Sequence, residues 1–190
     1  MHKKIPRVFV YLDKLDHHIL DNNNKNIGII YRNYKSKKKL KNLLKIAAFC
    51  RIRKYPLFVA NDLKLALKVN AKGIYIPSFN KLTVFNNYLG KKNLIILGSA
   101  HNFKEINEKI KQKCHGIFLS PIFFSSKNRK KLDIIKFNFL TIGKRKNFYA
   151  LGGIDQINLK KLQMLNIKGF AGIGIFKKKT GLFLGRLFKT

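Results

Sequence analysis

Short apolar runs alternate with longer amphipathic stretches along the whole chain, and this alternation limits the possible folds more than any other feature. Most runs are continuous aliphatic, β-branched or aromatic segments, which is typical of parallel strands covered on both faces. The expected strands are, in chain order, Arg7–Leu12, Ile27–Tyr31, Leu57–Ala60, Gly73–Ile76, Leu94–Gly98, Gly116–Leu119, Phe148–Leu151 and Gly169–Ile173.

Amphipathic, lysine-rich segments separate these runs. The longest, Ser36–Lys54, carries Leu40, Leu43 and Ala47 at helical spacing. Further helices are expected at Asp62–Val69, Lys81–Leu89, Asn102–Lys113, Gln156–Leu165 and Gly174–Phe188, with weaker crossovers at Asp13–Asn26 and Leu132–Thr141. Eight strands with helical crossovers predict an α/β fold, a compact closed (β/α)8 TIM barrel, with an open doubly wound sheet as the alternative. A length of 190 residues suits one domain spanning the whole chain.

Composition excludes several classes of protein. Apolar residues make up 46% of the chain, which is too many for a disordered protein. No apolar stretch approaches the roughly 20 residues of a membrane span. The basic N-terminus precedes an apolar run, Val8–Leu12, that is too short for a signal peptide, so a cytoplasmic location is expected. Cys50 and Cys114 lie in apolar surroundings, and we expect two buried free thiols.

The net charge of +33 has two interpretations. A strongly basic chain favours a phosphate-rich partner, either nucleic acid or an anionic metabolite. Lys, Asn, Ile and Phe are abundant, however, and they share A/T-rich codons, so genome composition alone would produce this charge. The lysines are scattered over every expected helix, and aromatic RNA-binding signatures and zinc-ligand spacings are absent. We therefore expect no dedicated nucleic-acid partner, and a basic nucleic-acid-binding protein stays as an alternative.

Small or polar residues follow seven of the expected strands. In a parallel barrel, the carboxyl ends of the strands meet on one rim, which is where such barrels place their active sites. The segments concerned are YRNYK, AND, IPS, GSAH, SPIFFSSK, LGGI and AGIGI. Their recurrence at the same end of each strand predicts a site on that rim.

Two of these strand ends favour an anionic ligand. Arg32 is a rare arginine at the end of an apolar strand, and its planar guanidinium matches a phosphate. Gly152 and Gly153 leave free backbone amides before an expected helix, although a tight turn would also require glycines. Gly172 and Gly174 provide a second small-residue turn. Together the two turns predict a phosphate cradle.

Three further residues are candidates for chemistry. Asp62 offers a hard oxygen ligand for Mg²⁺, although Asn61 or Asp62 would also cap the following helix. His101 is suited to acid–base chemistry, or it points outward. Lys127 lies in a polar loop that could reach the same pocket, where the basic residues 129–131 compete with it.

The ordered set of strand ends resembles the superfamily of thiamine phosphate synthase and TenI-type thiazole tautomerase. The similarity runs from about Val8 to Phe176 and is most specific in the arginine ending the second strand, Asn61–Asp62, GSAH, SPIF, ALGGI and GFAGIGIF. These motifs are specific to the superfamily and less decisive between its members.

The resemblance implies a condensation. Hydroxymethylpyrimidine diphosphate loses diphosphate, and the nitrogen of a thiazole phosphate captures the pyrimidine cation to give thiamine phosphate. Magnesium and basic groups would neutralise the leaving diphosphate, and backbone amides would hold the thiazole phosphate. The partners are then small-molecule phosphates, without a membrane, and self-association as a homo-oligomer is left open. A TenI-like tautomerase or a synthase-inactive homologue, with His101 as acid–base, is the alternative.

The resemblance also assigns roles to individual residues. Arg32, Asn61, Ser99 and Lys127 would contact the diphosphate substrate, Asp62 would bind Mg²⁺, and Gly153, Ile173 and Gly174, beside Gly152, would hold the thiazole phosphate.

Four positions depart from the pattern of this superfamily. Ile30 and Tyr34 stand where a glutamine and a lysine are expected, although Lys35 is adjacent. Asn80 replaces a second magnesium aspartate, and Gly174 replaces a serine. A site with one carboxylate should hold Mg²⁺ less firmly.

Overall fold

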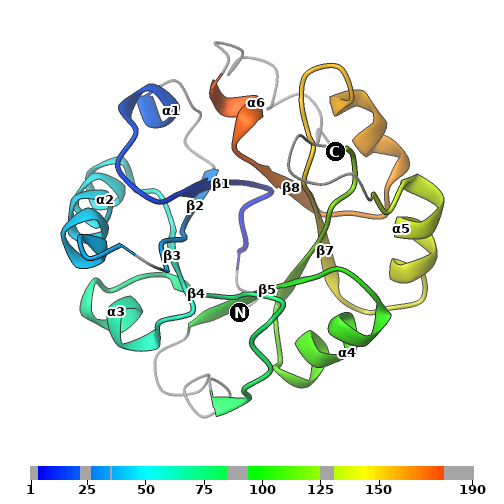
Figure 1. The fold of residues 1–190 in the computed structure, drawn as a ribbon, viewed down its shortest axis with the longest axis horizontal. Helices are drawn as coiled ribbons and strands as arrows, with labels where there is room; N and C mark the ends of the chain where they lie inside the picture. Colours follow the sequence, from blue (N-terminus) through cyan, green and yellow to red (C-terminus); the bar gives the residue numbers. More distant parts are fainter. Residues whose placement is uncertain (1–3, 22–26, 35, 85–93, 125–130, 178–190) are drawn as a thin grey trace.

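Eight parallel strands close into a barrel, with β8 hydrogen-bonded to β1 (Figure 1). The computed structural model describes residues 4–21, 27–34, 36–84, 94–124 and 131–177. The strands are β1 Val8–Leu12, β2 Ile27–Tyr31, β3 Leu57–Ala60, β4 Gly73–Ile76, β5 Ile95–Ala100, β6 Gly116–Leu119, β7 Asn147–Leu151 and β8 Gly169–Gly172. The closed (β/α)8 barrel is therefore confirmed over the open sheet, and every expected strand lies within two residues of its predicted bounds.

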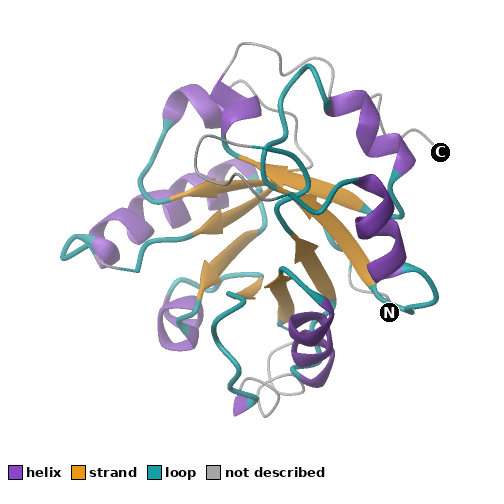
Figure 2. Ribbon diagram, turned by 45° about the vertical axis from the view of Figure 1, so that its right-hand side comes forward, coloured by secondary structure: helices purple, strands orange, loops and turns teal. Residues whose placement is uncertain are grey.

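Helices surround the barrel, as Figure 2 shows. They are α1 His17–Asp21, α2 Lys39–Arg53, α3 Leu63–Lys68, α4 Phe103–Lys111, α5 Ile134–Thr141, the 3-10 helix η2 Leu159–Met164, and α6 Gly174–Lys177. The weak crossover after β1 forms a short helix, α1. The helices expected at Lys81–Leu89 and Gly174–Phe188 fall largely outside the described residues.

The α-helix expected at Gln156–Leu165 was wrong in type, because the structure has the shorter 3-10 helix η2 there. The backbone amides of Asp155 and Asn158 each donate to the other residue's side chain, both at 3.0 Å. The side-chain nitrogen of Asn158, Nδ2, donates to the Gly153 carbonyl at 2.7 Å. These bonds hold a local turn that competes with helix formation, so η2 begins only after it.

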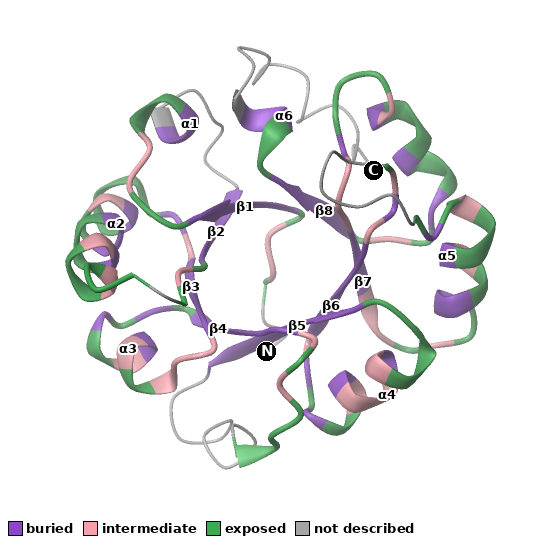
Figure 3. Cartoon of the chain, viewed as in Figure 1, coloured by how far each residue is buried: buried purple, intermediate pink, exposed green. Residues whose placement is uncertain are grey.

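Alternation along the strands separates two apolar clusters. Phe9 and Tyr11 of β1 face the barrel interior, and Val8, Val10 and Leu12 face the helices. The interior is filled by aromatic rings, with the ring of Phe9 5.1 Å from that of Phe118 and 5.4 Å from that of Tyr149 in edge-to-face contact. The strands are buried (Figure 3), so the barrel interior is a packed core, and a ligand site is expected at the rim of the barrel.

Cys50 and Cys114 are both free and buried, as expected. Burial raises the pKa of each thiol to about 12, so neither is a ready nucleophile. None of the helices among the described residues is long and apolar enough to cross a membrane.

Candidate active site

Because all eight strands are parallel, their carboxyl ends share one rim, and the polar strand ends of the sequence lie along it. Most of these residues are linked by a contact to the next strand around the barrel.

Arg32 lies over the mouth of the barrel. Its backbone amide continues the pairing of β2 with β1 by donating to the Leu12 carbonyl at 2.8 Å. The guanidinium carbon lies 4.9 Å from the centre of the Tyr11 ring, in cation–π contact. Tyr34 is half-exposed, and its ring lies 5.8 Å from that of Phe79. Lys35 is outside the described residues.

Two buried tyrosines and Ser99 form the floor beneath Arg32. The rings of Tyr11 and Tyr75 are 5.5 Å apart. Burial raises the pKa of Tyr75, and a hydrogen bond with Ser99 and the charge of Arg32 oppose that rise. The Tyr11 hydroxyl is buried and makes no hydrogen bond within normal limits, although burial and the nearby Tyr75 raise its pKa. The floor is thus a buried surface that carries two tyrosine hydroxyls and the Ser99 hydroxyl.

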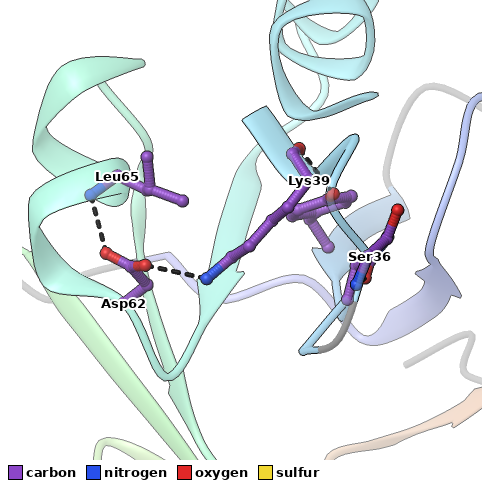
Figure 4. A network of polar contacts seen from close by, with 6 residues as sticks. Ser36, Lys39, Asp62 and Leu65 are labelled. Carbon is purple, nitrogen blue, oxygen red and sulfur yellow. Dashed lines mark hydrogen bonds and ion pairs between the residues drawn. The ribbon is translucent and has the colours of Figure 1, made fainter. Parts of the chain in front are cut away.

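Asp62 is both a helix cap and half of an ion pair (Figure 4). One carboxylate oxygen, Oδ1, accepts from the Leu65 amide at 2.9 Å and caps α3, as the capping alternative predicted. The other, Oδ2, lies 2.8 Å from Nζ of Lys39, at the start of α2. Burial alone would raise the pKa of Asp62, but hydrogen bonds from Lys39 and Leu65 outweigh it and lower that pKa.

Asn61 and Asn80 hold each other. Asn61 has a φ of 57°, a left-handed conformation that Asn tolerates, and this turns the chain from β3 toward α3. Its side-chain oxygen accepts from the Asn80 amide nitrogen. The side-chain oxygen of Asn80 accepts from the Leu82 amide at 2.8 Å. Both ends of the Asn80 amide are therefore committed within the protein.

A buried lysine fixes the loop that carries Asn80. Lys109 of α4 is fully buried, and its Nζ donates to the carbonyls of Pro77 and Asn80 and to Gln112 at 2.7–2.8 Å. Burial lowers the pKa of Lys109. Sequence reasoning missed this residue, although a lysine three residues after the buried Ile106 lies on the apolar face of its helix.

His101 joins β5 to β6. Its ring Nδ1 lies 2.8 Å from the Ser120 carbonyl, which only accepts hydrogen bonds, so the neutral ring carries its proton on Nδ1. The second ring nitrogen, Nε2, is then an acceptor. The ring is exposed on the rim, where it could take up a proton from a ligand.

The last part of the rim is built from backbone. Gly152 and Gly153 have φ values of 93° and 70°, and a Cβ on Gly153 would lie 2.4 Å from the Phe123 carbonyl oxygen. Both glycines are therefore required by the turn itself. Gly174 has open space around a would-be Cβ, and Ile173 is 39% exposed. Lys127, predicted to contact the diphosphate substrate together with Arg32, lies outside the described residues.

The rim thus has two parts of different construction. The charged arc comprises Arg32, Lys39, Asn61, Asp62 and Asn80, which project from the ends of β2, β3 and β4 and the start of α2. The glycine arc comprises Gly152, Gly153, Ile173 and Gly174 at the ends of β7 and β8. Among the described residues, no three His, Cys, Asp or Glu side chains form a group that could hold a metal ion.

Comparison with known proteins identifies the family of this chain. The model of the family described as thiamine monophosphate synthase matches residues 22–176, most of the chain. The chain belongs to the thiamine monophosphate synthase family. The superfamily resemblance drawn from the strand ends is therefore confirmed.

Curated members of this family are similar over part of their length. The thiamine-phosphate synthase of Flavobacterium johnsoniae is 32% identical over 128 residues, 62% of this chain and 60% of that protein. That of Prochlorococcus marinus strain SARG is 31% identical over 121 residues, 62% of this chain and 35% of that protein. The match thus spans about a third to three-fifths of these two relatives.

Solved structures share the barrel. Thiamine phosphate pyrophosphorylase from Pyrococcus furiosus superposes with a TM-score of 0.75 at 16% identity, covering 95% of this chain and 92% of that one. The 3-keto-L-gulonate-6-phosphate decarboxylase from Vibrio cholerae gives a TM-score of 0.69 at 12% identity, covering 96% of each chain. At these identities the likeness shows the fold alone.

Proposed function

We propose that this chain is a thiamine phosphate synthase, which condenses hydroxymethylpyrimidine diphosphate with a thiazole phosphate to give thiamine phosphate and diphosphate. The observation that carries the proposal is that the charged arc and the glycine arc lie on the same rim of one barrel. Two anionic substrates need two anion-binding regions that face a common space. Membership of the thiamine monophosphate synthase family supports this assignment.

The charged arc is the proposed site for the diphosphate substrate. Arg32 would contact a phosphate oxygen with its planar guanidinium, and Asn61 and Ser99 would contribute polar contacts. Contacts from Tyr34, Lys35 and Lys127 to the same substrate stay predictions of the sequence. In the reaction, the bond between the pyrimidine methylene carbon and the diphosphate oxygen breaks, and its electron pair leaves with diphosphate. Positive groups fixed at this end stabilise the charge that develops there.

The glycine arc is the proposed site for the thiazole phosphate. Gly153, with Gly152, Ile173 and Gly174, would present backbone groups to the phosphate without interposed side chains. Anchoring the phosphate there would direct the thiazole nitrogen toward the charged arc, where it forms the new carbon–nitrogen bond with the pyrimidine cation. His101 would then lie on the rim between the two substrates.

Magnesium stays a prediction of the family resemblance, and the residues at the predicted positions do not fit it. Both oxygens of Asp62 are engaged, one of them by a lysine ammonium, and the Asn80 amide is neutral and bonded at both ends. Mg²⁺ in proteins is usually held by one or two carboxylates with substrate phosphates and water. No step is therefore assigned to a metal ion.

The test is direct. Purified protein is incubated with both substrates, with and without Mg²⁺, and thiamine phosphate and released diphosphate are quantified. The proposal requires both products in equal amounts, and Arg32→Ala should lower their rate by about tenfold or more, the value of a lost charge-assisted contact. If wild-type protein yields neither product under either condition, the synthase assignment is wrong.

A further inference from the structure

The family resemblance expects a magnesium ion beside Asp62. In this structure the ammonium group of Lys39 occupies that position in the charged arc. Lys39 Nζ lies 2.8 Å from Asp62 Oδ2, and each side chain is 27% exposed (Figure 4). This ion pair joins α2 to the start of α3, at the carboxyl ends of the neighbouring strands β2 and β3. The ammonium therefore lies against the carboxylate that the family resemblance assigns to a metal ion.

The local structure holds Lys39 in this position. The Tyr31 hydroxyl at the end of β2 donates to the Lys39 carbonyl at 2.7 Å. Within the preceding loop, the Ser36 amide donates to Asn33 Oδ1 at 3.1 Å, and the Lys38 amide donates to Ser36 Oγ at 3.1 Å. These bonds place the first turn of α2 beside the rim, so the lysine is not simply one of many on an exposed helix face.

The charge of the arc supports the same conclusion. A Mg²⁺ ion held by two carboxylates forms a set with no net charge. Lys39 paired with Asp62, beside the neutral Asn80, also forms a set with no net charge. Asn80 in place of an aspartate removes one negative charge, and a lysine in place of a divalent ion removes one positive charge. The two replacements therefore leave the net charge of the set unchanged.

The ammonium has donors left for a ligand. It carries three N–H groups. Asp62 takes one of them, which is the hydrogen bond that Lys39 Nζ makes among the described residues. A diphosphate oxygen has several lone pairs and pairs readily with an ammonium. Arg32 lies on the same arc, and Tyr34 stands where the family resemblance expects another lysine, so Lys39 supplies a second cation to the charged arc.

We propose that Lys39, held by Asp62, is the diphosphate-binding cation of this site, so that the chain binds the diphosphate group without a divalent metal ion. This inference rests on the proposed function for its substrate, and it goes beyond that function by replacing the metal ion with a named side chain.

Binding of inorganic diphosphate tests the proposal without any turnover. Isothermal titration calorimetry is run in excess chelator and then in excess Mg²⁺, on the wild type and on Lys39→Gln. Lys45→Gln serves as the matched control, because Lys45 is exposed on the same helix α2. We expect wild-type affinity to change less than about twofold with Mg²⁺, Lys39→Gln to lose about tenfold, and Lys45→Gln to match the wild type.

A gain-of-function variant sharpens the test. The double variant Lys39→Gln with Asn80→Asp frees Asp62 and restores a second carboxylate, so its diphosphate binding should become dependent on Mg²⁺ by about tenfold or more. Circular dichroism confirms that each variant is folded, and Lys39→Arg, which keeps the charge, should retain affinity within about threefold if Lys39→Gln proves unstable.

The outcomes separate this inference from the proposed function. Wild-type protein that binds diphosphate only with Mg²⁺, that fails to bind it at all, or whose affinity is unaffected by Lys39→Gln overturns the inference. Metal-independent, Lys39-dependent binding together with an absence of thiamine phosphate formation supports the inference and counts against the synthase assignment. Thiamine phosphate formation that requires Mg²⁺ supports the synthase assignment and counts against the inference.

Discussion

The two arcs of the rim are built in different ways. The charged arc consists of side chains that are already engaged with one another, through the pair of Lys39 with Asp62 and that of Asn61 with Asn80. The glycine arc consists of backbone, and at Gly152 and Gly153 its geometry is fixed by positive φ values and close approach to the neighbouring loop. A change of side chain should therefore alter affinity in the charged arc, whereas a side chain added at Gly152 or Gly153 should alter the fold.

The largest effect is expected at Gly153. Alanine there would have to adopt a φ of 70° and place its Cβ 2.4–2.6 Å from backbone atoms of Phe123 and Phe124. The strain and the collision together should lower the free energy of unfolding by about 3 kcal/mol. Urea denaturation measures this loss, with Gly174→Ala as the control, because nothing lies within 4 Å of a Cβ at that position.

A change below about 1 kcal/mol is expected for Gly174→Ala. Equal losses in the two glycine variants would mean that the glycine arc is not fixed by the contact of Gly153 with the loop after β6.

Lys109→Met should have the next largest effect. The substitution removes the ammonium donor shared by the carbonyls of Pro77 and Asn80, which each keep one other donor, and we expect a loss of about 2 kcal/mol in unfolding free energy. Hydrogen exchange should quicken at the Asn80 amide, which donates to Pro77, and stay unchanged in the glycine arc. Lys104→Met, on the exposed side of α4, is the control. Faster exchange in both arcs would show that they are not independent.

Gly153 and Lys109 also show which features of the structure can be predicted from the sequence. Gly153 was found because a Gly–Gly pair after an apolar run is a local signal, and the strands were found because continuous apolar runs need no knowledge of their partners. Lys109 had a weaker signal, a charge three residues after Ile106 on one helix face, and it was missed.

The pair of Lys39 with Asp62 could not have been predicted in the same way. Its two members are 23 residues apart, and Lys39 is one lysine among many in a basic chain. Nothing in the local sequence distinguishes it from Lys38 or Lys41. Only the closure of the barrel, which places the start of α2 against the end of β3, selects this lysine. A cap on α3 from Asn61 or Asp62 was the alternative to a metal ligand, and the structure has Asp62 as the cap, but no local signal pointed to its ion-pair partner.

Substitution of Arg32 tests whether the two arcs bind different substrates. Arg32→Ala should weaken hydroxymethylpyrimidine diphosphate binding by about tenfold and leave thiazole phosphate binding within about twofold. Arg32→Lys should recover part of the loss, because it keeps the charge but not the planar fork. The exposed position predicts a stability change within about 0.5 kcal/mol. Calorimetric titration of each ligand checks this, and an equal loss for both would place them at one shared site.

The smallest effect is the pH dependence of the ion pair. The pKa of Asp62 is lowered in the folded protein from its ordinary value of 3.8, so the folded state favours the ionised carboxylate. Its contribution to stability should be fully present above pH 3.8 and be lost as the pH falls through the lower, folded-state pKa.

Asp62→Asn isolates this contribution, because the amide oxygen can still cap α3. The difference in unfolding free energy between the wild type and this variant should be no more than about 1 kcal/mol near neutral pH, since a partly exposed ion pair is screened by water. Denaturation at a series of acid pH values should show that difference shrinking toward zero, and a difference independent of pH would mean that the carboxylate charge is not what holds Lys39. The four residues of the glycine arc carry no ionisable side chain, so hydrogen exchange there should not follow the Asp62 titration if the two arcs are built as independently as their contacts indicate.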